Sequence, residues 1–169
     1  MKTLLLLRHA KSSWSNPGGN DHDRTLTPRG RRAAELVGLY VAQRGAPPSI
    51  ALCSSARRAQ DTLEPLRQRL DISVETVREL YLADPDTLLA QLAKVDDREA
   101  NVLVIGHNPG LHELALRLTA GGDGAARARL REGFPTAALA VLELDIERWD
   151  EIRPGCGALV ELRVPRDLV

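Results

Sequence analysis

The hydrophobic positions of this chain form short apolar runs that alternate with segments of helical periodicity. The apolar runs lie at residues 3–7, 49–53, 101–106, 136–144 and 158–164. Between them, apolar side chains recur every three to four residues, as they do along the buried face of a helix. This alternation predicts an α/β protein in which helices cover a mostly parallel sheet.

The first apolar run, TLLLL at residues 3–7, is typical of a strand that is buried on both faces of a sheet. Arg8 and His9 follow it directly. Two interpretations are open at this point. The pair is either a solvated strand end, which is the commoner situation, or a catalytic pair that a buried strand positions.

Signals for helix starts follow the first two runs. A Thr-Pro pair predicts the N-cap and first turn of a helix over residues 27–44. Ser54 or Ser55 can cap a second helix that ends near residue 70.

The rest of the chain continues the pattern. Residues 72–77 alternate apolar and polar side chains, which predicts an edge or half-exposed strand. Asp84 and Asn108 each precede a proline and predict helix starts. GGDG at residues 121–124 predicts a loop, and the last two apolar runs predict antiparallel neighbouring strands.

Length and composition narrow the class of protein. A chain of 169 residues favours a single domain over residues 1–169. The 23 Lys and Arg balance the 23 Asp and Glu, and this zero net charge argues against a nucleic-acid partner. No apolar stretch approaches the roughly 20 residues of a membrane span, so we expect no membrane partner. Cys53 and Cys156 lack zinc-ligand spacing, so we expect no metal site and a cytoplasmic location.

Cationic or titratable residues follow three of the predicted strands. Arg8 and His9 follow the first, Arg57 and Arg58 follow the second, and His107 follows the run at 101–106. Ligands of open α/β sheets bind beyond the carboxyl ends of the strands, so these side chains converge if the strands are parallel neighbours. Together with free amides at helix N-termini, they predict a small positive pocket for a phosphate dianion.

The usual motifs of nucleotide-dependent phosphoryl transfer are missing from the sequence. It contains no GxxxxGK[ST] loop, no GxGxxG loop and no obvious carboxylate cluster for magnesium. We therefore expect phosphoryl chemistry in which arginine, instead of a metal or cofactor, neutralises charge.

The order and spacing of these motifs resemble the histidine phosphatase superfamily, which includes phosphoglycerate mutases and SixA-type phosphohistidine phosphatases. Residues 8–10 are similar to its Arg-His-Gly signature, residues 54–62 to its Ser-x-x-x-Arg-Ala-x-x-Thr segment, and residues 106–107 to its Gly-His motif. DRTLTPRG at residues 23–30 resembles the Arg-x-Leu-Thr-x-x-Gly segment of SixA-type members. The resemblance implies a three-layer α/β/α fold with a mostly parallel central sheet, like that of phosphoglycerate mutase.

The resemblance also implies a role for each motif residue. His9 attacks phosphorus and forms a phosphohistidine intermediate that water cleaves. Arg8, Arg58 and His107 hold the phosphoryl oxygens and stabilise their charge in the transition state. Nearby positive charge keeps His9 neutral near pH 7, and a backbone carbonyl bound to its other ring N–H fixes the attacking tautomer. Arg57 takes the place of Arg58 if the helix register shifts by one, although the Arg-Ala-x-x-Thr spacing favours Arg58.

Four positions depart from the family pattern or match it weakly. Arg24 is a candidate phosphate or substrate contact, with a solvated loop arginine as the alternative. Ser15 stands where mutases commonly carry asparagine, and it is a candidate for substrate binding. Ala10 replaces a glycine and requires a backbone conformation that tolerates a Cβ. Glu79 is the nearest match to the family's catalytic glutamate, whereas Asp84 is better explained as a helix cap.

The weak acid/base motif favours a substrate with a good leaving group. A sugar phosphate leaves as an alkoxide, whose conjugate acid has a pKa on the order of 15. Phosphohistidine leaves as imidazole, with a conjugate pKa of about 6.5. We therefore expect a metal-independent, cofactor-free phosphatase that acts on a phosphorylated protein. The alternatives are a small-molecule phosphomonoesterase and a non-catalytic module that binds a phosphorylated ligand, and the intact His9 argues against the module.

Overall fold

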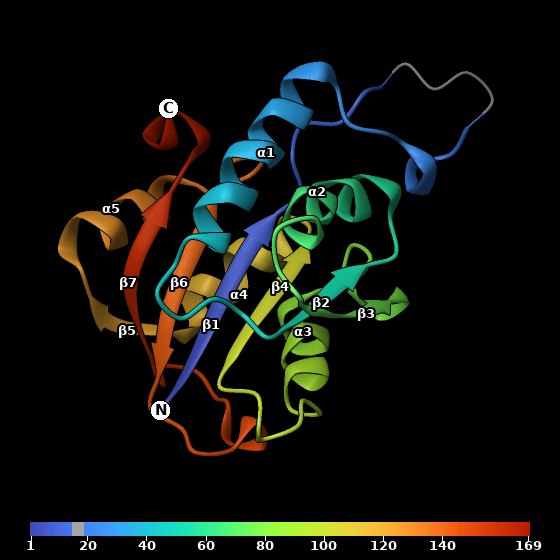
Figure 1. Cartoon of the computed structure of the whole chain (residues 1–169). Coiled ribbons are helices and arrows are strands. Elements are labelled where there is room, and N and C mark those ends of the chain that lie inside the picture. Colours follow the sequence, from blue (N-terminus) through green and yellow to red (C-terminus); the bar gives the residue numbers. More distant parts are fainter. Residues whose placement is uncertain (15–18) are drawn as a thin grey trace.

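The computed structural model describes residues 1–14 and 19–169, and in these residues a seven-stranded sheet has the order β3-β2-β4-β1-β6-β7-β5 (Figure 1). The strands are β1 (Lys2–Arg8), β2 (Ile50–Ser54), β3 (Ser73–Val77), β4 (Asn101–Gly106), β5 (Thr119–Gly122), β6 (Leu139–Leu144) and β7 (Gly157–Arg163). The α-helices are α1 (Pro28–Ala42), α2 (Arg57–Arg67), α3 (Pro85–Leu92), α4 (Gly110–Leu118) and α5 (Gly124–Glu132). Short 3₁₀ helices are η1 (Asp21–Asp23), η2 (Arg78–Leu80), η3 (Trp149–Glu151) and η4 (Pro165–Leu168).

The sheet is mostly parallel, as predicted. β4 lies between β1 and β2 and is parallel to both, and β3 extends this parallel set at the edge. β6 pairs antiparallel with β1 and with β7, so the two final strands are antiparallel neighbours as expected. The three strands that carry the predicted site residues therefore end at the same edge of the sheet.

The leucine run of β1 supplies both hydrophobic cores. Leu4 and Leu6 pack in the cluster that includes α3, α4 and α5, whereas Leu5 and Leu7 pack with α1 and α2. Each of the four is at most 2% exposed, and burial of one leucine contributes about 1.5–3 kcal/mol. The prediction of a strand buried on both faces is confirmed, and Figure 1 shows the three layers, with α1 in front of β1 and α4 behind the sheet.

Two predicted helix caps are confirmed and one is wrong. Thr27 accepts from the Gly30 amide at the start of α1, and Asp84 accepts from the Thr87 amide at the start of α3. Helix α2 has Ala56 as its N-cap, without a side-chain hydrogen bond. Neither Ser54 nor Ser55 caps the helix. Ser54 is the last residue of β2, and its hydroxyl contacts His107, whereas the hydroxyl of Ser55 lies 2.9 Å from Nε2 of His22.

The chain after α4 contains two elements that the sequence pattern did not predict. The segment expected as a loop at 121–124 forms the end of β5 and the start of α5. β5 is a four-residue edge strand that pairs with β7, and its glycines give no hydrophobic alternation. In α5, Ala126 and Leu130 are the buried residues, so the apolar face is too narrow to be seen as a periodic pattern.

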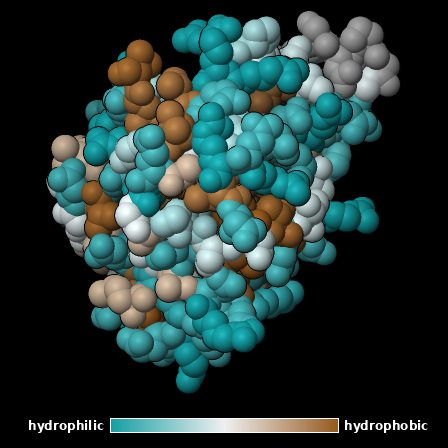
Figure 2. Space-filling model, in the orientation of Figure 1, coloured by the Kyte–Doolittle hydropathy of each residue, from teal (hydrophilic) through white to brown (hydrophobic). Residues whose placement is uncertain are grey.

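The face of the molecule shown in Figure 2 is mostly hydrophilic, with hydrophobic residues in separate groups. Within the described residues, no helix is long and apolar enough to cross a membrane.

Candidate active site

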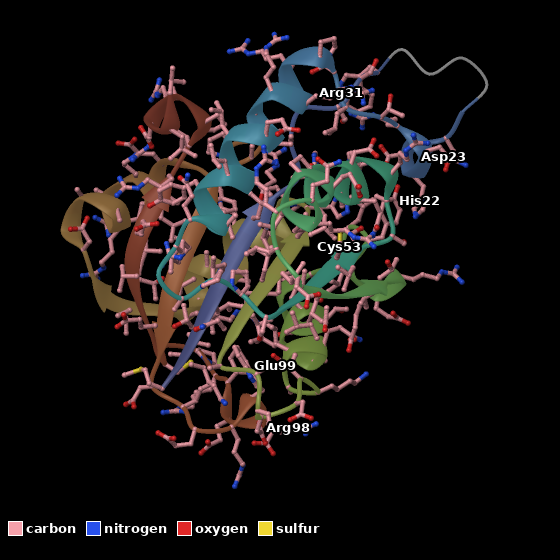
Figure 3. All side chains as sticks on the ribbon, in the orientation of Figure 1. His22, Asp23, Arg31, Cys53, Arg98 and Glu99 are labelled. Atoms are coloured by element: carbon pink, nitrogen blue, oxygen red, sulfur yellow. The ribbon has the colours of Figure 1, made fainter. Side chains whose placement is uncertain are left out.

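The site lies at the carboxyl ends of β1, β4 and β2. In the β1–β4 register, Arg8 lies opposite Gly106, so the next residues, His9 and His107, are neighbours. The His9 amide donates to the Gly106 carbonyl at 3.1 Å, and the two histidine rings are 5.2 Å apart between centroids. The convergence predicted from the three strand ends is therefore present. Figure 3 shows His22 and Asp23, on η1, at this end of the sheet and Arg98 and Glu99 at the opposite end.

His9 is buried, with 7% of its surface exposed, and its ring orientation is fixed by the backbone. Nδ1 lies 2.8 Å from the carbonyl oxygen of Ala10. A carbonyl can only accept, so Nδ1 carries the proton and Nε2 keeps its lone pair. Burial, together with the charges of Arg58 and Arg8 and against the opposing Ala10 hydrogen bond, lowers the pKa of His9 to about 4. A ring that is neutral near pH 7 with an unprotonated Nε2 has the form of a nucleophile.

Ala10 connects β1 to helix α2. It is fully buried, and it is not among the described residues with a positive φ, so the backbone tolerates its Cβ as expected. The Ala10 amide donates to the Thr62 hydroxyl at 2.9 Å, and that hydroxyl donates to the Arg58 carbonyl at 2.7 Å. This pair of bonds explains why the motif needs a threonine one helical turn after Arg58.

Arg58, not Arg57, points into the site. Arg58 is 3% exposed, with Nε 3.4 Å from Nε2 of His9 and Nη2 3.4 Å from Nδ1 of His107. The side chain of Arg57 is 61% exposed and pairs with Asp61 at 3.3 Å on the helix surface. The Arg-Ala-x-x-Thr spacing therefore identified the correct register.

His107 is the second buried histidine of the site. Its Nε2 lies 2.7 Å from the hydroxyl of Ser54, which also accepts from the Ala56 amide at 3.2 Å. Burial, followed by the charges of His9 and Arg58, lowers the pKa of His107 to about 3. Ser54 thus orients His107, a function that the sequence pattern did not reveal because the serine also suited a helix cap.

Arg8 adds a second guanidinium to the pocket. Its Nη1 donates to the Phe134 carbonyl at 3.2 Å, and Asn108 donates to the same carbonyl at 2.7 Å. Its Nε is buried without a hydrogen-bond partner among the described residues. Burial and the charge of Arg58 lower the pKa of the Arg8 guanidinium.

A carboxylate that the sequence analysis missed connects the arginines of the site. Asp21, in η1, accepts from Nη1 of Arg24 at 2.9 Å and from Nη2 of Arg58 at 3.1 Å. The Tyr81 hydroxyl also donates to Asp21, and this hydrogen bond is the main reason why the pKa of Asp21 lies well below its ordinary value. The contacts of Asp21 with Arg58 and Tyr81 join distant parts of the chain, so sequence spacing gave no signal for them.

The segment that carries Asp21 and Arg24 is fixed to the end of β1 by close backbone contacts. The Thr27 amide donates to the Lys11 carbonyl at 2.9 Å. A Cβ on Gly30 would lie 2.1 Å from that same carbonyl oxygen, so only glycine allows the first turn of α1 to approach it. This contact explains the glycine of the DRTLTPRG segment.

Together these groups line a cavity of about 420 Å³. Its lining residues are Arg8, His9, Lys11, Ser12, Trp14, Asp21, Arg24, Arg58, Leu82, His107, Asn108 and Thr136. Arg24 is thus in the pocket. Glu79 is exposed in η2 and is absent from the described residues that line it, whereas Ser15 lies outside the described residues. No group of three or more metal-ligating side chains occurs in the described part of the chain.

Comparison with known proteins agrees with this geometry. The model of the histidine phosphatase superfamily (branch 1) matches residues 4–81. A structure of SixA from Nakamurella multipartitia is 30% identical, covers 97% of this chain and 96% of its own, and superposes with a TM-score of 0.85. The protein histidine phosphatase SixA complexed with tungstate is 25% identical, with 99% of both chains covered and a TM-score of 0.77.

A sequence relative extends over the same length. The uncharacterized protein Rv1276c of Mycobacterium tuberculosis is 39% identical over 162 residues, which is 95% of this chain and 100% of the relative. The cationic pocket, with two buried histidines at the edge of a mostly parallel sheet, is the active site of a phosphatase. The chain belongs to the histidine phosphatase superfamily, and it has the phosphoglycerate mutase-like fold of the SixA structures.

Proposed function

We propose that this protein is a metal-independent phosphohistidine phosphatase that transfers the phosphoryl group of a phosphorylated protein to His9 and then to water. The observation that carries the proposal is the state of the carboxylate in the pocket. Among the described lining residues, Asp21 is the one carboxylate, and its contacts with Arg24, Arg58 and Tyr81 keep it ionised. An ionised carboxylate cannot protonate a leaving alkoxide, so the pocket suits a leaving group that needs little acid assistance.

In the first step, Nε2 of His9 attacks phosphorus in line with the bond to the leaving nitrogen. The new N–P bond forms as the old one breaks, and the substrate ring, which carries a proton on its other nitrogen, leaves as neutral imidazole with the bonding electron pair. Nδ1–H of His9 stays bonded to the Ala10 carbonyl, which stabilises the positive charge that the phosphorylated ring acquires. Arg8 and Arg58 stabilise the charge on the phosphoryl oxygens.

In the second step, water attacks the phosphorus of phosphorylated His9, the N–P bond breaks, and inorganic phosphate leaves. Burial and then the charges of His9 and Arg58 lower the pKa of His107, and the negative charge of a bound phosphoryl group opposes the effect of these charges. His107 then binds a proton more readily and can donate a hydrogen bond to a phosphoryl oxygen, while Ser54 keeps its ring in place. Two arginines supply the cationic charge that a metal provides in other phosphatases.

One observation favours a second candidate, a small-molecule phosphomonoesterase. The cavity of about 420 Å³ lies within the range that small ligands occupy, roughly 300–1,000 Å³. The two candidates differ in the leaving group. A side-by-side assay of a phosphohistidine peptide against a panel of sugar phosphates therefore separates them, with the higher kcat/KM expected for the peptide.

The covalent step is tested by trapping. Incubation with ³²P-labelled phosphohistidine peptide and a quench in base should leave label on the wild-type protein and none on His9→Ala. Turnover without label at His9 would contradict the proposal, and binding without turnover would identify a non-catalytic module. Dialysis against EDTA should leave kcat/KM unchanged.

A further inference from the structure

Two large apolar side chains flank the mouth of the catalytic cavity. Trp14 is 83% exposed and Leu82 is 56% exposed, and both line the cavity that contains His9. Single exposed apolar side chains are common on protein surfaces, but these two line the same cavity as the proposed nucleophile. They come from distant parts of the sequence, one after β1 and the other after η2.

Trp14 contacts Arg24, and Arg24 in turn contacts groups of the catalytic site. The Arg24 guanidinium lies 3.5 Å from the centroid of the indole ring, in a cation–π contact. Arg24 is itself held by the Ser13 carbonyl at 3.0 Å and by Asp21 at 2.9 Å. One face of the indole is therefore covered by a fixed cation, and its large exposed fraction leaves the ring accessible to a ligand.

Leu82 follows Tyr81, whose side chain contacts the catalytic site. Leu82 has a φ of 51°, in the left-handed region that leucine rarely adopts. Tyr81 donates to Asp21, and its ring is edge-on to His107 with 5.4 Å between centroids. The backbone thus turns sharply after a residue that contacts the site, and this turn leaves the leucine exposed at the mouth.

The direction of the reaction brings the leaving group to these two side chains. His9 is buried at the base of the cavity, and in-line attack requires the leaving atom on the side of phosphorus opposite Nε2. On that side the leaving group lies toward solvent, and Trp14 and Leu82 are the strongly exposed apolar side chains among the described lining residues. The leaving group therefore departs past an aromatic ring and an aliphatic side chain.

The cavity also continues beyond the space that a phosphoryl group needs. A second recess of about 590 Å³ shares Arg8 and Asn108 with the catalytic cavity. It is lined further by His112, Phe134 and Arg166, among others. The shared residues make the two recesses neighbours, so a polypeptide substrate bound at the first has a second concave surface beside it.

We propose that Trp14 and Leu82 determine specificity by binding the leaving imidazole and the polypeptide beside it. This inference rests on the proposed phosphohistidine phosphatase function and names the surface that recognises the protein substrate. The flat imidazole ring and neighbouring apolar side chains match the indole face and the leucine better than a sugar with many hydroxyl groups does.

The test compares two substrates that share an N–P bond. A phosphohistidine peptide has a leaving group that reaches the mouth, whereas phosphoramidate releases only ammonia. The ratio of kcat/KM for the peptide to that for phosphoramidate should fall about tenfold in Trp14→Ala and in Leu82→Asn, mainly through KM. Asparagine tolerates the left-handed backbone at position 82, which keeps the turn intact.

Matched controls separate binding from general damage. Trp14→Phe should restore most of the ratio, and Leu39→Ala, which removes a 41% exposed leucine on α1, should leave it unchanged. An unchanged ratio in both mouth variants would overturn the inference while the wild-type turnover of the peptide still supports the proposed function. A wild-type protein that hydrolyses sugar phosphates and not the peptide would overturn both.

Discussion

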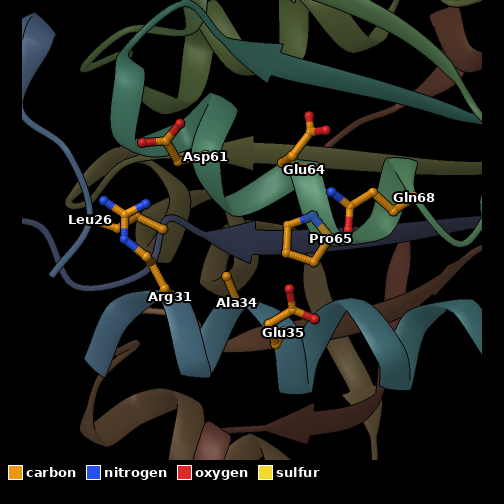
Figure 4. Close-up of a pocket in the computed structure, with 8 residues that line it drawn as sticks. All are labelled: Leu26, Arg31, Ala34, Glu35, Asp61, Glu64, Pro65 and Gln68. Carbon is orange, nitrogen blue, oxygen red and sulfur yellow. The ribbon is translucent and has the colours of Figure 1, made fainter. Parts of the chain in front are cut away.

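The recess between α1 and α2 and the pocket at the carboxyl ends of β1, β4 and β2 carry opposite charges. The helix recess has a volume of about 180 Å³ (Figure 4). Its lining residues are Leu26, Arg31, Ala34, Glu35, Asp61, Glu64, Pro65 and Gln68. Its charged side chains come from the outer faces of two helices, where Arg31, Glu35 and Glu64 are exposed. The strand-end pocket instead takes its charged side chains from the end of β1, from the segment that follows it through η1, and from the start of α2.

The two regions also differ in how their charges are neutralised. In the helix recess, Asp61 pairs with Arg57 at 3.3 Å and Glu35 pairs with Arg69 at 2.9 Å, and such surface pairs contribute about 0–1 kcal/mol. In the strand-end pocket, Arg58 is 3% exposed and a buried Nε of Arg8 has no partner in the described residues. Burial of cations costs free energy unless an anion compensates. Asp61 of the helix recess also has a buried oxygen without a partner among the described residues, so burial of the cationic side chains, more than the number of charges or of partners, distinguishes the site from the helix surface.

The largest effect should come from removing the proposed nucleophile. His9→Ala should lower kcat by about 10⁴-fold or more, because the covalent route is lost while Arg8 and Arg58 remain. Inorganic phosphate should still bind, which isothermal titration calorimetry can measure. If His9→Ala retained turnover, His9 would not be the nucleophile, and the strand-end pocket would lose its main functional difference from the helix recess.

A smaller effect separates the two neighbouring arginines of α2: Arg58 lines the strand-end pocket, whereas Arg57 pairs with Asp61 of the helix recess. Arg58→Ala should reduce kcat by about 10²–10³-fold, the scale of a lost oxyanion donor. Arg57→Ala is the matched control and should change kcat less than about twofold, because its side chain is exposed and pairs with Asp61. Equal losses in the two variants would show that the surface arginine also acts in the reaction.

The buried histidines also predict how stability depends on pH. The pKa of His9 is lowered from 6.5 to about 4, so between these values the unfolded chain binds more protons than the folded protein. Stability is therefore highest above about pH 6.5 and is lost as the pH falls toward 4. Between about pH 7 and about pH 4.5, wild type should lose about 2 kcal/mol more than His9→Gln, whose side chain stays neutral.

Urea unfolding of the two proteins at both pH values measures this difference. Parallel losses in wild type and His9→Gln would mean that His9 titrates alike in the folded and unfolded states. The pocket would then lack the electrostatic character that separates it from the helix recess.

Much of the fold and the core of the site could be predicted from sequence because local patterns carry them. The leucines of β1 mark a strand buried on both faces, and the strand-end positions of His9, Arg58 and His107 follow from parallel pairing. β5 and α5 could not be predicted, because a four-residue edge strand and a helix with two buried residues leave almost no periodicity.

The remaining part of the site depends on tertiary contacts that spacing does not encode. Asp21 and Tyr81 are 60 positions apart, and they meet only because η1 and the turn after η2 lie at the same edge of the sheet. The sequence pattern suggested Ser54 as a helix cap, but its hydroxyl orients His107. Glu79, chosen by motif alone, is exposed and outside the described lining of the pocket, so its proposed acid role is the least supported by the geometry.

The smallest effect is expected in the helix recess itself. Glu64→Gln and Arg31→Gln remove opposite charges from exposed positions on α2 and α1, and each should change kcat/KM less than twofold. Each should also shift the free energy of unfolding by no more than about 0.5 kcal/mol, as is usual for surface substitutions. Kinetic assays and urea unfolding of both variants measure these quantities. A loss of activity near that of Arg58→Ala would show that the recess takes part in substrate binding, because neither side chain has the burial that would explain such a loss through stability.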